Sequence, residues 1–213
     1  MSTPPEPSPP LHEPTIAVRR ATPDDVPQLA AAFARAFYDD PLMSWMVPDR
    51  SNRLERLRRF FTHSLRRMIT KNVRDVYTTI NVAGAATWAQ PGEWKLPVRV
   101  MLPGVPGMLR AVGPAAMARI SRAHIFLEAK HPHEPHMYLE GLATDPPHQR
   151  QGIASALLRH VLDRCDVEGL PAYLTTQNPD NVPFYVRHGF TITGEIDIPA
   201  GGPHMWLMWR DPR

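Results

Sequence analysis

Residues 138–158 constrain the fold of this chain more than any other stretch. They read as a hydrophobic strand, a polar turn and a helix that opens at a glycine, Gly152. The helix carries one apolar stripe at helical spacing, made of Ile153, Leu157, Leu158, Val161, Leu162 and Cys165. A helix start leaves backbone N–H groups without partners and carries partial positive charge. The stretch therefore predicts a phosphate-binding turn between a strand and a helix.

Strands and helices are mixed on both sides of this unit, and no internal repeat is visible, which predicts a mixed α/β (α+β) fold. Before the unit we expect a strand at 15–20, a helix that starts at Thr22 and ends near 39–41, a helix at 51–70, and strands at 76–80 and 84–88. After it we expect a strand at 172–176, a short helix at 182–188 that Gly189 stops, and a strand pair at 190–198 and 204–209.

The chain divides into a tail and one domain. Residues 1–14 contain six prolines and predict a disordered tail, so residues 15–213 form the domain. Residues 91–130 are rich in proline, glycine, methionine and alanine, and we expect one or two helices there that cover the substrate side.

Charge and hydropathy exclude several classes of protein. Lys+Arg 24 against Asp+Glu 21 leaves a net charge of +3, too weak to indicate nucleic-acid binding, and the arginines of 53–67 are better explained as a solvated helix face. No membrane span or signal peptide is indicated, so a cytoplasmic location is expected. The single cysteine, Cys165, lies on the apolar stripe, which indicates a core side chain.

Two polar clusters suggest sites that we do not favour. Three histidines and an acid fall within residues 131–136, but no cysteine or distant carboxylate completes a ligand set, so we expect a loop and no metal. Asp39 and Asp40 follow the aromatic residues Phe37 and Tyr38 and would suit a cationic substrate. A helix-terminating loop with solvated acids is the preferred interpretation.

The turn at Gln149-Arg-Gln-Gly-Ile-Ala lacks both the Gly-Lys-Ser/Thr ending of kinase-type loops and the Gly-x-Gly-x-x-Gly of dinucleotide sites. It matches Gln/Arg-x-x-Gly-x-Gly/Ala between a strand and a helix. Upstream lies Leu142-Ala-Thr-Asp-Pro, and downstream lie the strand at 172–176 and Asn181-x-x-Phe-Tyr185-x-x-x-Gly-Phe190. In order and spacing, these features resemble the GNAT N-acetyltransferase superfamily.

The resemblance spans about residues 15–210 and is most specific over 135–209. It implies a central mixed, mostly antiparallel sheet flanked by helices, with a splayed strand pair that holds acetyl-CoA. Within the superfamily, Asp145-Pro-x-His-Gln and the closing Trp-x-Met strand look most like puromycin N-acetyltransferase-like proteins. That likeness implies direct acetyl transfer to a small-molecule amine.

The resemblance also implies roles for single residues. Main-chain groups of Leu142, Ala143 and Thr144 would hold the pantetheine arm of CoA, and Asn181 would contact the cofactor. The pyrophosphate would lie on the turn and helix start, which comprise Gln149, Arg150, Gln151, Gly152, Ile153, Ala154 and Ser155. Ala154 replaces the second glycine of the pattern and adds only a methyl group.

Tyr185 matches the family's proton donor to the departing thiolate, although a core tyrosine beside Phe184 is the alternative. Glu140 shares strand parity with Tyr138 and Leu142, so it is the candidate base; alternatively, it binds the charge of the substrate or points elsewhere.

Two other functions stay open: acetylation of a protein or peptide amine, and a non-catalytic acyl-CoA-binding module. We expect no nucleic-acid or membrane partner, and a homodimer is left open. The acceptor amine and the acyl chain length are not determined by the sequence.

Overall fold

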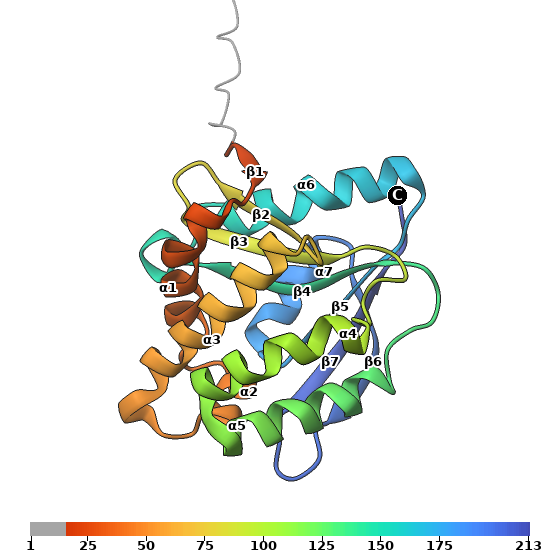
Figure 1. The fold of residues 1–213 in the computed structure, drawn as a ribbon. Coiled ribbons are helices and arrows are strands. Elements are labelled where there is room, and N and C mark those ends of the chain that lie inside the picture. The colour runs from red at the N-terminus through yellow and green to blue at the C-terminus, as the bar shows by residue number, and fades with distance from the viewer. Residues whose placement is uncertain (1–15) are drawn as a thin grey trace, which may run out of the picture.

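A computed structural model describes residues 16–213, so the tail expected at residues 1–14 lies outside the described residues. The described chain folds around one seven-stranded sheet with strand order β1-β2-β3-β4-β5-β7-β6 (Figure 1). The strands are β1 (Val18–Arg20), β2 (Asp75–Thr79), β3 (Gly84–Ala89), β4 (Met137–Thr144), β5 (Ala172–Thr176), β6 (Thr191–Asp197) and β7 (His204–Arg210). All neighbouring strands are antiparallel except β4 and β5, which are parallel. The expected mixed, mostly antiparallel α/β fold is confirmed.

Seven α-helices accompany the sheet in the described chain. They are α1 (Val26–Ala36), α2 (Pro41–Met46), α3 (Arg50–Thr70), α4 (Val98–Met101), α5 (Val105–Glu128), α6 (Ile153–Glu168) and α7 (Val182–Arg187). The helix α6 covers one face of the sheet, and α1, α3 and α5 cover the other (Figure 1). Neighbouring strand residues alternate between the two cores: Tyr77 packs with α6, whereas Val76 packs with α1 and α3.

The apolar stripe expected on α6 is confirmed, because all six of its residues are buried, and Cys165 is fully buried. The sequence pattern of α3 was less reliable. Leu57, Phe61 and Leu65 are buried, but Leu54 is 47% exposed. Arg53, expected on the solvated face, is buried, and its guanidinium donates to the carbonyls of Tyr38, Val47 and Pro48.

The segment 91–130 forms helices as expected, and α5 packs against α3. Pro114 lies inside α5, and Gly113 before it has φ 77°, a left-handed conformation that glycine adopts without steric cost. The two residues therefore bend α5 midway along its length.

The histidine run forms a buried pair. The Nε2 atoms of His131 and His136 lie 3.0 Å apart, and the ring of His131 stacks on Trp94 with centroids 3.9 Å apart. The loop leads directly into β4, as expected. Over residues 16–213, no group of three or more His, Cys, Asp or Glu residues has an arrangement that would hold a metal ion. None of the helices described is both long enough and apolar enough to span a bilayer.

The strands β4 and β5 pair over only part of their length. The ladder joins Met137–Leu139 to Ala172–Leu174, while β4 runs on to Thr144 and β5 to Thr176. On its other edge, β4 stays paired with β3 as far as Thr144. Past Leu139, the edge of β4 that faces β5 is therefore free, which is the splayed pair expected from the sequence.

A β-bulge lies at the point where the two strands separate. Leu139 pairs with Trp88 and Gly141 with Thr87, so Glu140 is an extra residue on β4. Such a bulge changes the direction of the side chains on either side of it, and strict strand parity does not describe Glu140.

Candidate active site

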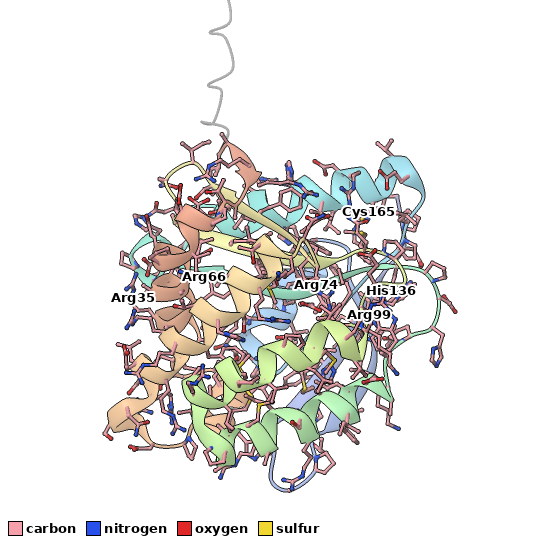
Figure 2. All side chains as sticks on the ribbon, viewed as in Figure 1. Arg35, Arg66, Arg74, Arg99, His136 and Cys165 are labelled. Carbon is pink, nitrogen blue, oxygen red and sulfur yellow. The ribbon has the colours of Figure 1, made fainter. Side chains whose placement is uncertain are left out.

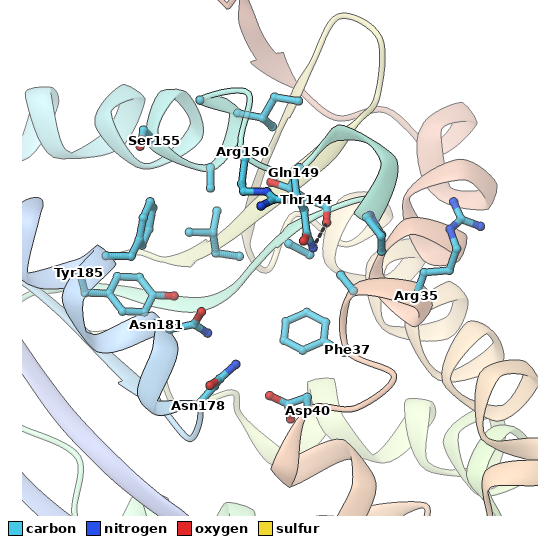
Figure 3. Close-up of a pocket in the computed structure, with 18 of the residues that line it drawn as sticks. Arg35, Phe37, Asp40, Thr144, Gln149, Arg150, Ser155, Asn178, Asn181 and Tyr185 are labelled. Carbon is cyan, nitrogen blue, oxygen red and sulfur yellow. Dashed lines mark hydrogen bonds between the residues drawn. The ribbon is translucent and has the colours of Figure 1, made fainter.

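The larger of two adjoining cavities in the described chain lies at the opening between β4 and β5 and has a volume of about 710 Å³ (Figure 3). It is bounded by the start of α6, by α7 and by the segment that joins α1 to α2. Residues proposed from sequence that line it are Leu142, Ala143, Thr144, Gln149, Arg150, Gly152, Ile153, Ala154, Ser155, Asn181 and Tyr185. Gln151 does not line the cavity, and its side chain donates to the carbonyl of Pro147 (3.4 Å).

The turn before α6 offers a row of free backbone donors. Among the described residues, none accepts a hydrogen bond from the backbone N–H groups of 151–155, and the first helical bond runs from Ala156 N to Gly152 O (2.9 Å). Gly152 has φ 82° and Arg150 has φ 61°, so two left-handed residues shape the turn. Because no side chain caps α6 either, the donors suit an anion.

An ion pair that the sequence reasoning missed fixes this turn to α1. Arg35 binds both carboxylate oxygens of Asp145, at 2.8 Å and 2.6 Å. Gln149 Nε2 donates to the carbonyl of Thr144 (3.2 Å), the bond drawn in Figure 3. The segment 144–149 before α6 is thus fixed by one contact to α1 and by one within itself.

Tyr185 lies on α7 with 8% of its surface exposed, and its hydroxyl points into the cavity beside Asn181 (Figure 3). Burial, and then the negative charge of Asp40, raise the pKa of the Tyr185 phenol above its ordinary range. The phenol therefore keeps its proton at neutral pH and is available as a donor.

The smaller cavity, of about 250 Å³, adjoins the larger one, because Phe37, Leu142, Asn181 and Tyr185 line both. Apolar side chains of α1, α3 and the start of α2 form one side of it, and its remaining lining comes mainly from β3, β4 and β5 and includes polar residues. Tyr185 of α7 and the free edge of β4 therefore lie where the two cavities join.

Glu140 lines the smaller cavity and forms an ion pair. Its Oε1 lies 2.5 Å from Nη2 of Arg74, whose side chain is 3% exposed and which Figure 2 labels near the middle of the molecule. The other Arg74 contacts are the backbone carbonyls of Val73, Glu93 and Trp94. The charge of Glu140 is thus balanced by a buried guanidinium that the sequence reasoning missed.

The interpretation of Asp39 and Asp40 as solvated acids is wrong for Asp40. Asp39 is exposed and pairs with Arg50 (3.0 Å). Asp40 instead turns inward: its carboxylate accepts from the backbone N–H of Met43 (3.0 Å) and from Gln177 Nε2. It lines the larger cavity, and burial raises its pKa above the ordinary aspartate value.

Known proteins resemble this chain in sequence and fold. Residues 112–190, which include β4, α6, β5 and α7, match the model of the acetyltransferase (GNAT) family. An uncharacterised N-acetyltransferase of Schizosaccharomyces pombe is 22% identical over 92% of this chain and 84% of its own length.

Solved structures share the fold across nearly the whole chain. One is described as the histone acetyltransferase HPA2 and related acetyltransferase from Corynebacterium glutamicum; it has a TM-score of 0.71, is 24% identical, and aligns over 93% of this chain and 97% of its own. Another is the PaiA N-acetyltransferase from Thermoplasma acidophilum in complex with coenzyme A, with a TM-score of 0.55, 12% identity and coverage of 92% and 98%.

The fold with its splayed strands is that of the GNAT acyltransferases. The match over residues 112–190 and the named relatives support an acyltransferase enzyme with this fold.

Proposed function

We propose that this protein transfers an acetyl group from acetyl-CoA to the amine of a small molecule. The observation that carries the proposal is the junction of the two cavities, where Leu142, Asn181 and Tyr185 line both. The larger cavity has the anion-binding turn at its wall, and the smaller has room for a compact acceptor.

In this proposal, the larger cavity holds acetyl-CoA. The backbone N–H groups of 151–155 lack acceptors in the described chain and would receive the pyrophosphate, with Gln149 and Arg150 beside it. The free edge of β4 at Leu142, Ala143 and Thr144 would bind the pantetheine arm in the manner of an added strand. Asn181 contributes an amide at the junction. The bound coenzyme A of the Thermoplasma acidophilum structure, which has the same fold, supports this choice of co-substrate.

The chemistry is direct transfer. The neutral amine nitrogen attacks the thioester carbonyl, a C–N bond forms, and the C–S bond breaks. A main-chain N–H of β4 would stabilise the developing oxyanion, Tyr185 would protonate the leaving thiolate, and a carboxylate would take the proton that the amine loses. Glu140 belongs to the acceptor side, where its carboxylate, held by Arg74, faces the amine.

Nothing in this scheme requires a covalent enzyme intermediate. Cys165 lies in the core beneath α6, fully buried, and burial raises the pKa of its thiol to about 11. The thiol is therefore protonated at neutral pH and out of reach of either cavity, neither of which it lines.

A panel of small amines incubated with acetyl-CoA, followed by thiol release, tests the proposal. We expect saturable turnover with at least one amine and a product heavier by one acetyl group. Thiol release that never exceeds the rate without acceptor would refute catalysis and leave an acyl-CoA-binding module.

Acetylation of a protein amine is the second candidate, favoured by the likeness to a structure described as a histone acetyltransferase. Incubation of a cell extract with labelled acetyl-CoA separates the two. Label on proteins supports the second candidate, whereas label confined to small metabolites supports the first.

A further inference from the structure

We propose that the smaller cavity takes a primary amine carried on a compact, uncharged body of aromatic size. This inference rests on the proposed acetyl transfer and adds to it the class of acceptor. It is drawn from the walls of the cavity, their shape and their charge.

The walls present aromatic rings from two helices. Phe33 of α1 and Phe37, the residue that follows α1, face Phe60 and Phe61 of α3. The ring centroids of Phe33 and Phe61 are 5.2 Å apart, those of Phe37 and Phe61 5.5 Å, and those of Phe60 and Phe61 4.9 Å. Leucine and methionine side chains complete these walls, namely Leu42, Met43, Leu65, Met68, Leu127, Leu139 and Met205. A ring would gain offset and edge contacts on these walls, whereas the rest of the lining, including Thr87, Thr175 and Thr176, is polar.

The charge inside the cavity is limited to one carboxylate. Among the lining residues, the ionisable side chains are Tyr138, Glu140 and Tyr185. The Glu140 carboxylate is already balanced by Arg74, and no cationic side chain lines the cavity. A second ammonium or a carboxylate on the acceptor would lose its hydration on binding and would find no oppositely charged partner in the cavity. Its burial would therefore weaken binding. Polyamines and amino acids are therefore disfavoured relative to monoamines.

The orientation of the acceptor follows from which residues are shared. Asn181 and Tyr185 line both cavities, so the amine lies at that end. The α3 residues Phe60, Ser64 and Met68 line only the smaller cavity, so the body of the acceptor lies against α3.

Ser64→Leu tests this placement by filling the α3 wall. Thr62→Leu is the matched control, since Thr62 lies on the same helix and lines neither cavity. We expect wild type to prefer phenethylamine at least tenfold in kcat/KM over spermidine and over an amine-bearing peptide. Ser64→Leu should raise KM for phenethylamine about tenfold, with acetyl-CoA affinity unchanged, while Thr62→Leu matches wild type.

Preference for spermidine or the peptide, or a Ser64→Leu KM equal to wild type, overturns the acceptor class while leaving acetyl transfer intact. Binding of acetyl-CoA with no turnover on any amine refutes the proposed function, and the acceptor class falls with it.

A separate observation concerns the carboxylate that takes the amine's proton. We infer that this group is Asp40, with Glu140 acting as a positioning residue for the acceptor. The carboxylate of Asp40 and the hydroxyl of Tyr185 border the same space from opposite sides (Figure 3). Gln177, which donates a hydrogen bond to the Asp40 carboxylate, lines the smaller cavity. Asp40 therefore lies beside the junction of the two cavities.

The two carboxylates differ in their partners. In the described chain, Asp40 accepts only from uncharged donors and forms no ion pair, whereas Glu140 contacts Arg74. The other charged side chains that line the larger cavity are Arg35, Asp39, Arg150 and Arg187, of which Arg35 is bound by Asp145 and Asp39 by Arg50. A buried carboxylate without a cation accepts a proton more readily than one that must give up an ion pair.

Asp40→Asn tests the assignment without removing the helix cap, because asparagine caps helices as well as aspartate does. Asp163→Asn, at an exposed aspartate of α6 that lines neither cavity, is the matched control. We expect Asp40→Asn to lower kcat by about 10²- to 10⁴-fold and to abolish the rise of kcat with pH at the acid end, with an unchanged thermal midpoint. Glu140→Gln should mainly raise KM for the amine and keep that rise.

The assignment is overturned if Asp40→Asn keeps the rise of kcat with pH at the acid end and a kcat within about threefold of wild type. The assignment is also overturned if this rise of kcat with pH is lost in Glu140→Gln and kept in Asp40→Asn. Asp163→Asn should keep the wild-type pH profile.

Discussion

Mild acid should destabilise this protein through its buried histidine pair. His131 is 8% exposed, stacks on Trp94 and meets His136 Nε2 to Nε2 at 3.0 Å. At least one of the two facing nitrogens must lack a proton for that contact to be a hydrogen bond. Burial, and then the proximity of His136, lower the pKa of His131 to about 3.

The magnitude follows from linkage. Unfolded, the imidazole has a pKa of about 6.5 and takes up a proton as the pH falls from 7 to 5, while the folded His131 stays neutral. Because the unfolded state then binds more protons, stability falls with falling pH between about 6.5 and 3. Integrated from pH 7 to 5, one such histidine lowers the free energy of unfolding by about 2 kcal/mol.

Urea unfolding at pH 7 and pH 5 measures this loss. His131→Phe keeps a ring for stacking on Trp94 but cannot titrate, so its loss between the two pH values should be smaller than that of wild type by about 2 kcal/mol. The variant will be less stable at both pH values, because His136 Nε2 loses its partner, but the pH difference isolates the titration. His133→Asn, at an exposed neighbour, should behave as wild type.

Other titrating groups remain in the variant, so they do not account for the difference between the variant and wild type. Asp25, whose pKa the Arg19 hydrogen bond lowers to about 2, contributes only at pH values below the window. His136, whose pKa burial also lowers, remains in the variant and leaves a residual pH dependence. If His131→Phe loses as much stability as wild type, to within about 0.5 kcal/mol, His131 is not the group responsible.

Two further predictions concern the site. Tyr185→Phe should lower kcat by about 10²- to 10⁴-fold while acetyl-CoA affinity, measured by calorimetry, stays the same; unchanged turnover across pH would remove Tyr185 from the reaction. Gly152→Ala should weaken acetyl-CoA binding and cost about 1 kcal/mol of stability, because Gly152 has φ 82°. Gly169→Ala is its control, since Gly169 also has a left-handed φ of 68° but ends α6 away from both cavities: it should lose similar stability and keep its affinity.

Features that depend on neighbours in sequence were predicted well. The apolar stripe of α6 and the left-handed stop at Gly189 follow from periodicity and from the conformational freedom of glycine, so they need no knowledge of the rest of the fold. The strand β5 was predicted with its observed bounds for the same reason.

Features that join distant parts of the chain were missed. The Arg35 partner of Asp145 lies 110 residues away, and the Gln177 partner of Asp40 lies 137 residues away. Arginine on a helix is normally solvated, so the burial of Arg53 becomes apparent only when the carbonyls around it are in place. The bulge at Glu140 arises from pairing with β3, and this pairing is invisible in the alternation of β4 alone.

The same physical cause raises the pKa of the proposed acid, Tyr185, and of the proposed base, Asp40. Burial at the cavity junction raises the pKa of both Tyr185 and Asp40, and the negative charge of Asp40 raises that of Tyr185 further. For the Tyr185 phenol, the raised pKa means that the proton stays on the oxygen until the departing thiolate accepts it. For a carboxylate, the same shift means a stronger base than a solvated aspartate. Loss of the Asp40 charge therefore removes the proton acceptor and also lessens the rise in the pKa of Tyr185, so the two groups form a coupled pair and their substitutions should not act additively on kcat.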